Sequence, residues 1–518
     1  MQRFAGRTAL VVDGVSYSYD ELHRHAGRIA AAIRQNEQQP FPLAAVWAHR
    51  SVTAYTGVLG CLAAGKGYVP LNPKFPMQRT LRMLSLSGCS VIVVGKECLP
   101  QLPELLEGID RSVAVILPHL NESERVASRH AGQRILHREQ MPCRDESTEA
   151  PRPCETSPAY LLFTSGSTGE PKGVPISHRN VRAYLDYVRA EYELNEHDRF
   201  SQQFDLTFDL SVHDMFVCWE CGAALYCVPE KSLMGPAKFI RDHRLTVWFS
   251  VPSVAGLMAK LHMLTPGCFP SLRYSLFCGE PLPEAYAQAW QVAAPNSVVE
   301  NLYGPTETTI AIAHFRWDPT KSAKDSANGI VPIGRVFEGQ DCRIVNPQGM
   351  VVPVGETGEL CLSGSQIASG YWNNPTKTQE KFMRLPGGAE QMWYRTGDLV
   401  KQNTAGNLFY LGRTDHQIKI RGYRVELQEI EAVLRRTCGT EQVIAIPWPV
   451  RDGTAEGIVS FVSGVESLDQ ERVLARCGDL LPDYMVPKKV YLIDELPLNA
   501  NQKVDRGMLA KILEGARA

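Results

Sequence analysis

The stretch YLLFTSGSTGEPKG, residues Tyr160–Gly173, decides how this 518-residue chain is interpreted. Its first residues are apolar, as in a buried strand, and they lead into a run of serine, threonine and glycine that precedes Lys172. Glycines let a backbone curl so that its N–H groups face an anion, and the hydroxyls and the lysine add donors. The spacing is not that of the nucleotide-triphosphatase loop. The stretch therefore predicts a phosphate-binding loop after a strand, with a flexible serine- and glycine-rich turn as the alternative.

Strands and helices alternate on the N-terminal side of this stretch. Ser18–Glu21 has the sequence of a helix capping box, and an apolar helical face follows it. Ala44–Trp47 is typical of a short buried strand, Tyr55–Ala64 of a helix, and Val91–Val94 of a central parallel strand. Strand–helix–strand repetition predicts an α/β fold of packed layers. After Gly412 the chain becomes more charged, so we expect a domain boundary there.

The composition excludes several classes of protein. Hydrophobic residues make up 44% of the chain and charged residues 21%, as in globular proteins, which excludes a disordered or fibrous protein. With 54 basic and 56 acidic residues the net charge is −2, which gives no electrostatic footprint for nucleic acid or an anionic membrane. No apolar run is long enough to span a bilayer, and no secretory signal is visible. The 14 scattered cysteines suit reduced thiols, so we expect a cytoplasmic protein.

A second cluster of aromatic and polar residues is NLYGPTETT, residues Asn301–Thr309. An aromatic ring such as that of Tyr303 can stack on a base, a threonine hydroxyl can donate to a phosphate, and the carboxylate of Glu307 can hold Mg2+. A capped helix start would explain the same residues. This cluster alone leaves a nucleotide site and a helix start as alternatives.

Together, the two stretches resemble the adenylate-forming superfamily, which includes amino-acid-activating domains, acyl- and aryl-CoA synthetases and luciferases. The resemblance covers almost the whole chain and is closest to free-standing enzymes of the alanine–carrier protein ligase type. It implies a large N-terminal domain of layered α/β subdomains at residues 1–412 and a small mobile α+β domain at 413–518, which carries a catalytic lysine. Five further stretches resemble the family's motifs and follow in the expected order: Gly57–Arg79, Gly358–Pro375, Tyr394–Val400, Gly412–Glu431 and Leu496–Arg506.

The resemblance implies an ATP-dependent ligase that forms AMP and pyrophosphate. Tyr303 is then expected to stack on adenine, and Asp398 to accept both ribose hydroxyls, although a turn aspartate is the alternative for Asp398. The residues similar to those that hold the triphosphate in the family are Thr164, Ser165, Gly166, Ser167, Thr168, Gly169 and Lys172. The residues similar to those around adenine and ribose are Gly279, Glu280, Asn301, Tyr303, Gly304, Asp398 and Arg413.

Three residues are expected, by the same resemblance, to act on the reacting groups. Thr306 matches the residue that meets the α-phosphate, and Glu307 matches the ligand of Mg2+. Lys503 matches the catalytic lysine that bridges the substrate carboxylate and the phosphate oxygens. Two neighbours of Lys503 depart from the family's usual pattern, and a solvated surface lysine is the alternative. Asp415 resembles the hinge about which the C-terminal domain turns between the two half-reactions.

The stretch FDLTFDLSVHDMF, residues Phe204–Phe216, bears on the acid that is activated. Phe208 stands where coenzyme A ligases often carry histidine, and Asp209 resembles the aspartate that pairs with a substrate α-ammonium group. A buried carboxylate repels an acid substrate unless that substrate also brings a cation, which favours an amino acid. A helix N-cap is the alternative for Asp209, and Asp205 and Asp214 are competing candidates for the pairing.

The remaining pocket positions, transferred by resemblance, favour a small neutral amino acid: alanine first, then serine, glycine or proline. They are Leu210, His213, Ser253, Leu276, Cys278, Leu302, Ile310 and Ala311, beside Phe208 and Asp209. His213 is expected to be a wall of the pocket, with a polar contact to the substrate side chain as the alternative. The chain stops fifteen residues after Lys503, so the expected thiol acceptor is the phosphopantetheine of a separate carrier protein, as in nonribosomal peptide synthesis. The alternatives are an acyl- or aryl-CoA synthetase and a non-catalytic nucleotide-binding relative.

Overall fold

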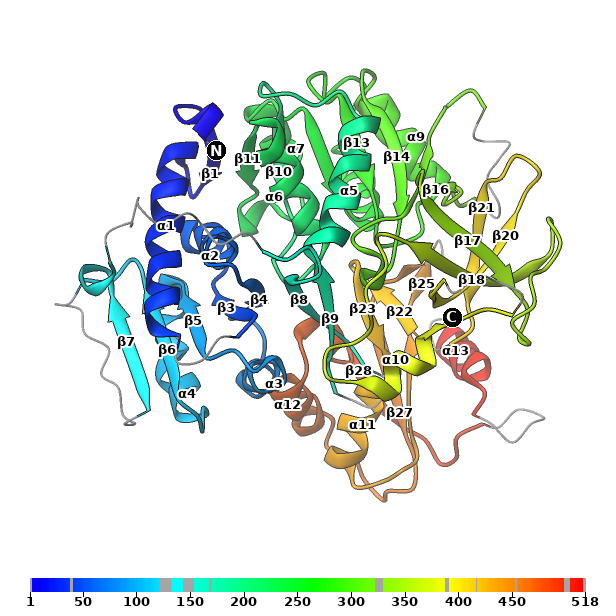
Figure 1. The fold of residues 1–518 in the computed structure, drawn as a ribbon. Helices are drawn as coiled ribbons and strands as arrows, with labels where there is room; N and C mark the ends of the chain where they lie inside the picture. Colours follow the sequence, from blue (N-terminus) through cyan, green and yellow to red (C-terminus); the bar gives the residue numbers. More distant parts are fainter. Residues whose placement is uncertain are drawn as a thin grey trace. The chain divides into compact units, whose positions relative to one another are not determined.

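The computed structural model describes residues 2–37, 41–121, 132–142, 153–166, 170–321, 329–386, 391–415, 417–451, 454–497 and 504–515 (Figure 1). Contacts between Cα atoms divide the chain into two units. The first is formed by Met1–Pro73, Leu81–Phe163 and Gly173–Thr414, and the second by Lys74–Thr80, Thr164–Lys172 and Asp415–Ala518. The expected mixture of sheets and helices, an α/β fold, is confirmed.

A nine-stranded sheet forms one layer of the first unit. Its strand order is β16-β15-β14-β13-β12-β10-β11-β1-β2, and the pairs from β14 to β1 are parallel, whereas the outer pairs are antiparallel. The strands are β1 (Thr8–Val12), β2 (Val15–Ser18), β10 (Arg199–Gln202), β11 (Ala224–Cys227), β12 (Val247–Ser250), β13 (Tyr274–Phe277), β14 (Val298–Tyr303), β15 (Ala313–Arg316) and β16 (Arg335–Val336). Its central strands are buried, as parallel strands with two covered faces must be.

A seven-stranded sheet contains the strand that precedes the predicted phosphate loop. Its order is β7-β6-β5-β3-β4-β8-β9, with parallel pairs from β7 to β8. The strands are β3 (Leu43–Trp47), β4 (Gly67–Leu71), β5 (Val91–Val94), β6 (Val113–Leu117), β7 (Gln133–His137), β8 (Pro158–Thr164) and β9 (Lys172–Ser177). The predicted strands at Ala44–Trp47 and Val91–Val94 are therefore confirmed.

A five-stranded antiparallel sheet completes the first unit. Its strands are β17 (Gln340–Val345), β18 (Thr357–Gly364), β19 (Phe382–Met383), β20 (Trp393–Gln402) and β21 (Leu408–Arg413). The helices of this unit are α1 (Tyr19–Asn36), α2 (Val52–Ala63), α4 (Leu102–Glu107), α5 (His178–Glu191), α6 (Leu210–Cys221), α7 (Ala237–Asp242), α8 (Pro252–Lys260), α9 (Glu284–Ala293) and α10 (Pro375–Lys381); α3 (Met77–Ser87) runs across the division between the units. The predicted capping box of α1 is present, because the Ser18 hydroxyl and the Glu21 carboxylate bond each other's backbone N–H groups.

The second unit is an α+β arrangement in its C-terminal segment. The strands there are β22 (Gln417–Ile420), β23 (Tyr423–Glu426), β24 (Val443–Pro447), β25 (Val450–Arg451), β26 (Thr454–Ala455), β27 (Ile458–Val462) and β28 (Lys489–Leu492). The helices are α11 (Leu427–Cys438), α12 (Gln470–Leu480) and α13 (Arg506–Gly515). A core of aliphatic residues joins α11 and α12 to the sheet β24-β27-β28.

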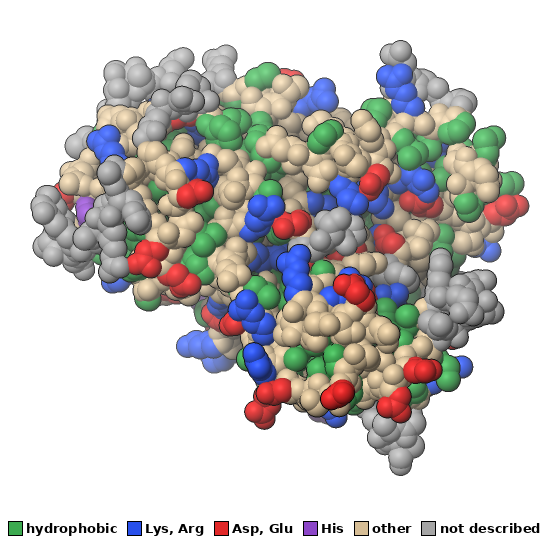
Figure 2. Space-filling model, turned by 90° about the horizontal axis from the view of Figure 1, so that it is seen from below, with side chains coloured by type: hydrophobic (Ala, Val, Ile, Leu, Met, Phe, Trp, Pro, Cys, Tyr) green, Lys and Arg blue, Asp and Glu red, His purple; other side chains and the backbone are tan. Residues whose placement is uncertain are grey.

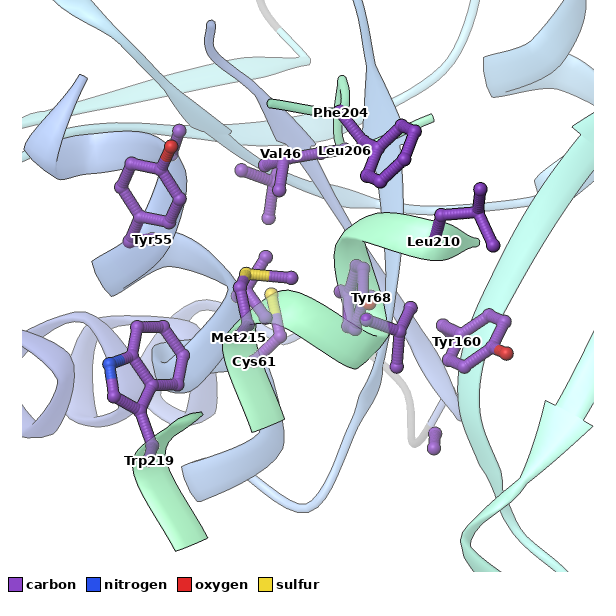
Figure 3. Packing of buried hydrophobic residues seen from close by; sticks show 14 of the residues in the cluster. Val46, Tyr55, Cys61, Tyr68, Tyr160, Phe204, Leu206, Leu210, Met215 and Trp219 are labelled. Carbon is purple, nitrogen blue, oxygen red and sulfur yellow. The ribbon is translucent and has the colours of Figure 1, made fainter. Parts of the chain in front are cut away.

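Helix α6 is the part of the core that positions the candidate site. Nearly every residue of its first two turns is buried, so this helix is covered on all sides. Figure 3 shows its side chains among those of α2 and of neighbouring strands. The labelled residues of these elements are Val46 from β3, Tyr55 and Cys61 from α2, Tyr68 from β4, Tyr160 from β8, and Leu210, Met215 and Trp219 from α6.

The distribution of charged side chains on the surface agrees with the small net charge of the chain. On the face drawn in Figure 2, Lys and Arg side chains are interspersed with Asp and Glu side chains. Among the helices of the described ranges, none combines the length and the apolar character that crossing a bilayer requires.

Candidate active site

The turn after β14 brings two separate parts of the predicted site together. Gly304 follows the strand directly, and a Cβ atom at this position would lie 2.6 Å from the Cα of Ala311 and 2.9 Å from the carbonyl oxygen of Ile310. Real Cβ atoms do not approach backbone so closely, so glycine is required here. The close approach places the predicted nucleotide residue Gly304 against the predicted pocket residues Ile310 and Ala311.

A short 3₁₀ turn, η6 (Thr306–Thr308), carries the residues expected to act on the phosphates. Glu307 is fully buried, and the Tyr371 hydroxyl donates to its Oε1 at 2.7 Å. Thr306 is half-buried at the start of the turn. The helix start that was the alternative explanation for these residues is therefore a single 3₁₀ turn. The Glu307 carboxylate accepts its hydrogen bond from a tyrosine hydroxyl.

Asp398 and Arg413 lie opposite each other on β20 and β21. Arg413 donates from Nη1 to Asp398 Oδ1 at 2.5 Å, and the Tyr303 hydroxyl donates to Oδ2 at 2.5 Å. Burial, and then the charge of Asp398, raise the pKa of Tyr303 well above 10, so its hydroxyl stays a donor. A carboxylate has about four acceptor positions, so these two bonds leave capacity for the two hydroxyls of a ribose. Because Asp398 lies within β20, its alternative as a turn residue is wrong.

The residues expected around adenine lie at the ends of neighbouring parallel strands. Gly279 follows β13 with φ 92°, and Glu280 accepts the backbone N–H of Ser253 at 2.9 Å. Asn301, inside β14, donates its amide to the carbonyl oxygens of Val331 and Pro332. The Oδ1 atom of Asn301 is buried and accepts no hydrogen bond from the described residues. A buried acceptor needs a donor, and the exocyclic amine of adenine is one, so this part of the site fits an adenosine group.

The predicted phosphate loop belongs to the second unit. The Ser165 hydroxyl donates to the carbonyl oxygen of Arg424 at 2.8 Å, and the Gly166 N–H donates to Glu429 Oε2 at 3.3 Å. The Thr164 hydroxyl is buried and has no partner among the described residues. Lys172 opens β9. Ser167, Thr168 and Gly169, together with Lys503, lie outside the described residues, and Asp415 is the first residue of the last segment of this unit.

Asp209 stands directly before α6, and only 4% of it is exposed. It occupies the N-cap position, as the alternative predicted, but its side chain makes no capping hydrogen bond. Burial, and then the negative charge of Asp209, raise the pKa values of the Tyr68 and Tyr160 hydroxyls. Both hydroxyls are buried without a hydrogen-bond partner among the described residues.

The two competing aspartates have other surroundings. Asp205 accepts hydrogen bonds from His49 Nδ1 at 2.9 Å, from Asn72 Nδ2 at 2.8 Å and from Thr207, so it is held in a polar cluster of its own. Asp214 is fully buried on α6, and burial raises the pKa of its carboxyl well above the ordinary value of 3.8. A neutral acid does not pair with an ammonium group as a carboxylate does. Asp209 is therefore the aspartate of the three that suits this role best.

The predicted pocket walls gather in one hydrophobic cluster with Tyr68, Tyr160 and Tyr184. His213 is fully buried in contact with this cluster; its Nδ1 lies 2.7 Å from the Tyr184 hydroxyl, and its ring centroid lies 4.8 Å from that of Phe249. The wall residues in the cluster are Leu210, Leu276, Cys278, Leu302, Ile310 and Ala311, with Phe208 packed against it; Ser253 lies at the start of α8. The contact of these residues with a substrate stays a prediction.

Comparison with known proteins identifies the family to which this chain belongs. Residues 1–372 match the model of the AMP-binding enzymes. The chain belongs to this family. The adenylation domain AlmE of Vibrio cholerae, whose structure holds glycyl-adenosine-5'-phosphate, is 36% identical, with a TM-score of 0.89 over 99% of this chain and 96% of AlmE. This family confirms the expected enzyme class, an ATP-dependent ligase of the adenylate-forming kind.

Curated relatives of this AMP-binding enzyme include both small and very large proteins. D-alanine–D-alanyl carrier protein ligase of Bacillus licheniformis is 29% identical over 97% of this chain and 95% of its own length. Tyrocidine synthase 3 of Brevibacillus parabrevis is 32% identical over 98% of this chain. The chain spans only 7–9% of the length of the first curated relatives it matches. The chain therefore matches only a small part of each of these synthases.

The resemblance to the adenylate-forming superfamily implies Mg2+, and the surroundings of Glu307 fit the part of a ligand. Mg2+ usually keeps several waters and takes one or two carboxylates together with substrate phosphates, so one buried glutamate suffices. Glu307 Oε1 accepts a bond from the Tyr371 hydroxyl, and a carboxylate has about four acceptor positions in all. Among the described residues, one cluster of three metal-capable side chains occurs elsewhere, at Glu191, Glu300 and His314. Arg316 pairs with both of its carboxylates, which marks that cluster as an ion-pair network.

Two side chains at this site were not predicted from the sequence. The Tyr371 hydroxyl donates to the Glu307 carboxylate, and the Gln366 amide donates to the backbone carbonyl of Ala311. Both lie in the stretch Gly358–Pro375, whose resemblance to a family motif carried no assigned role. A glutamine among small and apolar residues was the available signal, because such a side chain is buried only when its amide has partners.

The titration of His213 gives a test of its burial in this AMP-binding enzyme. Burial lowers the pKa of His213 from 6.5 to about 3, so the folded protein keeps this imidazole neutral while the unfolded chain protonates it near pH 6.5. The contribution of His213 to stability is therefore complete above that pH and is lost as the pH falls. We expect the free energy of unfolding to drop by roughly 2 kcal/mol more in the wild type than in His213→Gln between about pH 6.5 and pH 5.

Chemical denaturation at a series of pH values measures this difference. Replacement of the exposed His197 by glutamine is the matched control for the loss of a histidine. Parallel curves for the wild type and His213→Gln would contradict the burial of a neutral imidazole.

Proposed function

We propose that this chain activates a small neutral amino acid with ATP as its aminoacyl-adenylate and transfers the aminoacyl group to the phosphopantetheine thiol of a separate carrier protein. One observation carries the choice of an amino acid. Asp209 is buried at the N-cap position of α6, directly before the pocket-wall residue Leu210, and its side chain makes no capping hydrogen bond. A buried carboxylate repels an acid that carries no positive charge, whereas it attracts the α-ammonium group of an amino acid.

The expected size of the substrate amino acid follows from the side chains that line the predicted pocket. Leucine and isoleucine side chains at Leu210, Leu276, Leu302 and Ile310 are all buried in one cluster, which favours alanine first, then serine, glycine or proline. The glycyl adenylate bound by AlmE and the D-alanine named for the carrier protein ligase support a small substrate.

The proposed chemistry has two steps. The substrate carboxylate oxygen attacks the α-phosphorus of ATP, a new acyl–phosphate bond forms, and the bond to the β-phosphate breaks to release pyrophosphate. Asp398 and Tyr303 hold the nucleoside, Thr306 donates to the α-phosphate, and Lys503 stabilises the developing charge. Mg2+, held by Glu307, neutralises phosphate charge when it is bound. In the second step the thiol loses its proton, its sulfur attacks the acyl carbon, and AMP leaves.

In the proposed mechanism, Lys503 lies on a mobile C-terminal domain that starts near residue 413, and Asp415 is the hinge of this domain. Alternation of this domain lets one site run adenylation and thiol transfer in different geometries. The C-terminal segment of the second unit begins at Asp415 and has its own hydrophobic core, which supports its movement as a body.

Amino-acid-dependent exchange of pyrophosphate into ATP tests the proposed function. Across a panel of all proteinogenic amino acids and their D-isomers, we expect alanine, serine, glycine or proline to give the highest exchange, because longer side chains would overfill a packed pocket. Transfer should then need a phosphopantetheinylated carrier, with free coenzyme A a poor acceptor.

Fatty or aryl acids that support exchange, with efficient transfer to coenzyme A, would establish the alternative of a CoA synthetase. ATP binding without exchange on any acid would establish a non-catalytic relative. In each case the assignment of Asp209 to an ammonium group would be wrong.

A further inference from the structure

Two neighbouring residues between η6 and β15 have an unfavourable backbone conformation. The φ angles of Thr309 and Ile310 are 61° and 71°, in the left-handed region. Both side chains are β-branched, and such residues rarely adopt this region because the Cβ crowds the following carbonyl oxygen. Conformations of this kind persist only where the surrounding structure holds them.

The group that holds this turn is the side chain of Gln366, which follows β18 and is fully buried. Its Nε2 lies 2.8 Å from the carbonyl oxygen of Ala311 and 3.3 Å from those of Thr308 and Thr309. In return, the Thr309 hydroxyl donates to the backbone carbonyl of Gln366 at 2.6 Å. One glutamine thus satisfies carbonyl groups on both sides of the strained pair.

The loop that carries Gln366 is itself fixed from α5. The Asn180 amide donates to the carbonyl oxygens of Ser365 and Ile367 at 2.7 and 3.1 Å, and Asn180 is in turn held by the capping box of that helix. Gln340 adds a bond to each of Ser365 and Gln366. The position of Gln366 is therefore fixed by bonds of its loop to Asn180 and Gln340 and does not depend on the position of the turn at Thr309 and Ile310.

The same loop also contacts Glu307. The Ala368 N–H donates to the Glu307 carbonyl at 2.9 Å, and the Tyr371 hydroxyl donates to Glu307 Oε1 at 2.7 Å. Segment 366–371 therefore bonds both the residue proposed to hold Mg2+ and the turn that carries Ile310 and Ala311. A displacement of the turn would move the phosphate side and the amino-acid side of the site together.

We propose that Gln366 is a positioning residue that sets the strained turn Thr308–Ala311, and through it the amino-acid pocket and the carboxylate of Glu307. This inference rests on the proposed function for its effect on catalysis, whereas its structural part concerns the turn alone. Gln366 touches no reacting group; it acts through the backbone that it holds.

The test is Gln366→Met, which keeps the length of the side chain and removes its donor. The matched control is Gln133→Met, since Gln133 is a buried glutamine of β7 whose amide donates to the Leu106 carbonyl, away from these residues in the first unit. We expect the kcat/KM of exchange to fall by about 10–100-fold in Gln366→Met, because positioning errors of this size are costly. The KM for the amino acid should rise and kcat should fall. Gln133→Met should keep the wild-type kinetics.

Hydrogen exchange of the amides in residues 306–312 gives a second readout that does not depend on catalysis. We expect these amides to exchange at least tenfold faster in Gln366→Met and at the wild-type rate in Gln133→Met. Thr309→Val, which removes only the hydroxyl, should shift both readouts in the same direction by a smaller factor, and it provides the test if Gln366→Met does not fold. Kinetics within twofold of the wild type together with unchanged hydrogen exchange would overturn the proposal. A wild type that exchanges pyrophosphate with no amino acid would refute the proposed function, and hydrogen exchange would still decide whether Gln366 holds the turn.

Discussion

Replacement of Asp209 by alanine is expected to lower amino-acid-dependent pyrophosphate exchange by about two to three orders of magnitude. An ammonium–carboxylate pair strengthens when water is excluded, and breaking a buried pair costs roughly 3–5 kcal/mol because one charge is left alone. Each ~1.4 kcal/mol corresponds to a factor of ten in binding. The loss should appear in kcat/KM for the amino acid, while the KM for ATP should hardly change, since other residues hold the nucleotide.

Asp214→Asn is the matched control for this experiment. Asp214 lies on α6, a short distance along the chain from Asp209, and burial raises the pKa of its carboxyl, so an amide of the same shape replaces a group that is already neutral. Asp214→Asn should therefore keep its amino-acid specificity. The Asp209→Ala variant should also accept propionate better than the wild type does, because no carboxylate then faces the methylene that lacks the amine. Near wild-type specificity in Asp209→Ala would remove the main argument against a CoA synthetase.

Replacement of Lys503 by alanine is expected to slow adenylation by at least about 10²–10³-fold. That is the usual cost of removing one preorganised donor to charge that develops in a transition state. Transfer of the aminoacyl group from supplied adenylate should suffer much less, because the proposed domain movement has by then taken Lys503 away from the site. Single-turnover measurements of each half-reaction separate the two steps.

Lys511→Ala serves as the control for a lysine on the same domain. Lys511 is exposed on α13, and its loss should change neither half-reaction. Equal losses in both half-reactions of Lys503→Ala would contradict the account of two geometries, and an undiminished adenylation rate would show that Lys503 is a solvated surface lysine.

Local sequence was sufficient where a single segment determines the outcome. The capping box at Ser18 and the apolar run Val91–Val94 specify their own helix and strand, and both are present. Pairings between distant segments were not predictable from such patterns. In the nine-stranded sheet, Leu10 of β1 pairs with Leu225 of β11, and nothing near either residue specifies the other.

The same distinction applies to the candidate site. The aromatic and acidic character of Tyr303 and Glu307 is readable in the sequence, but the partners that orient them, Asp398 and Tyr371, come from other sheets or loops. The left-handed backbone at Ile310 was not predictable, because isoleucine disfavours it and the side chain that bonds this turn, Gln366, comes from a distant segment.

The close approach at Gly304 limits how the substrate choice of this chain can change. The backbone of Gly304 lies against that of Ala311, so the segment between them has a fixed length and path. An insertion or deletion there would break this contact and move the phosphate side of the site along with the pocket. The predicted pocket walls Leu276 and Leu302, by contrast, lie on the neighbouring paired strands β13 and β14, where a side chain can be exchanged with little movement of the backbone. If the proposed function holds, we expect point substitutions in these strands to change the substrate, and we expect loop grafting at this turn to abolish activation.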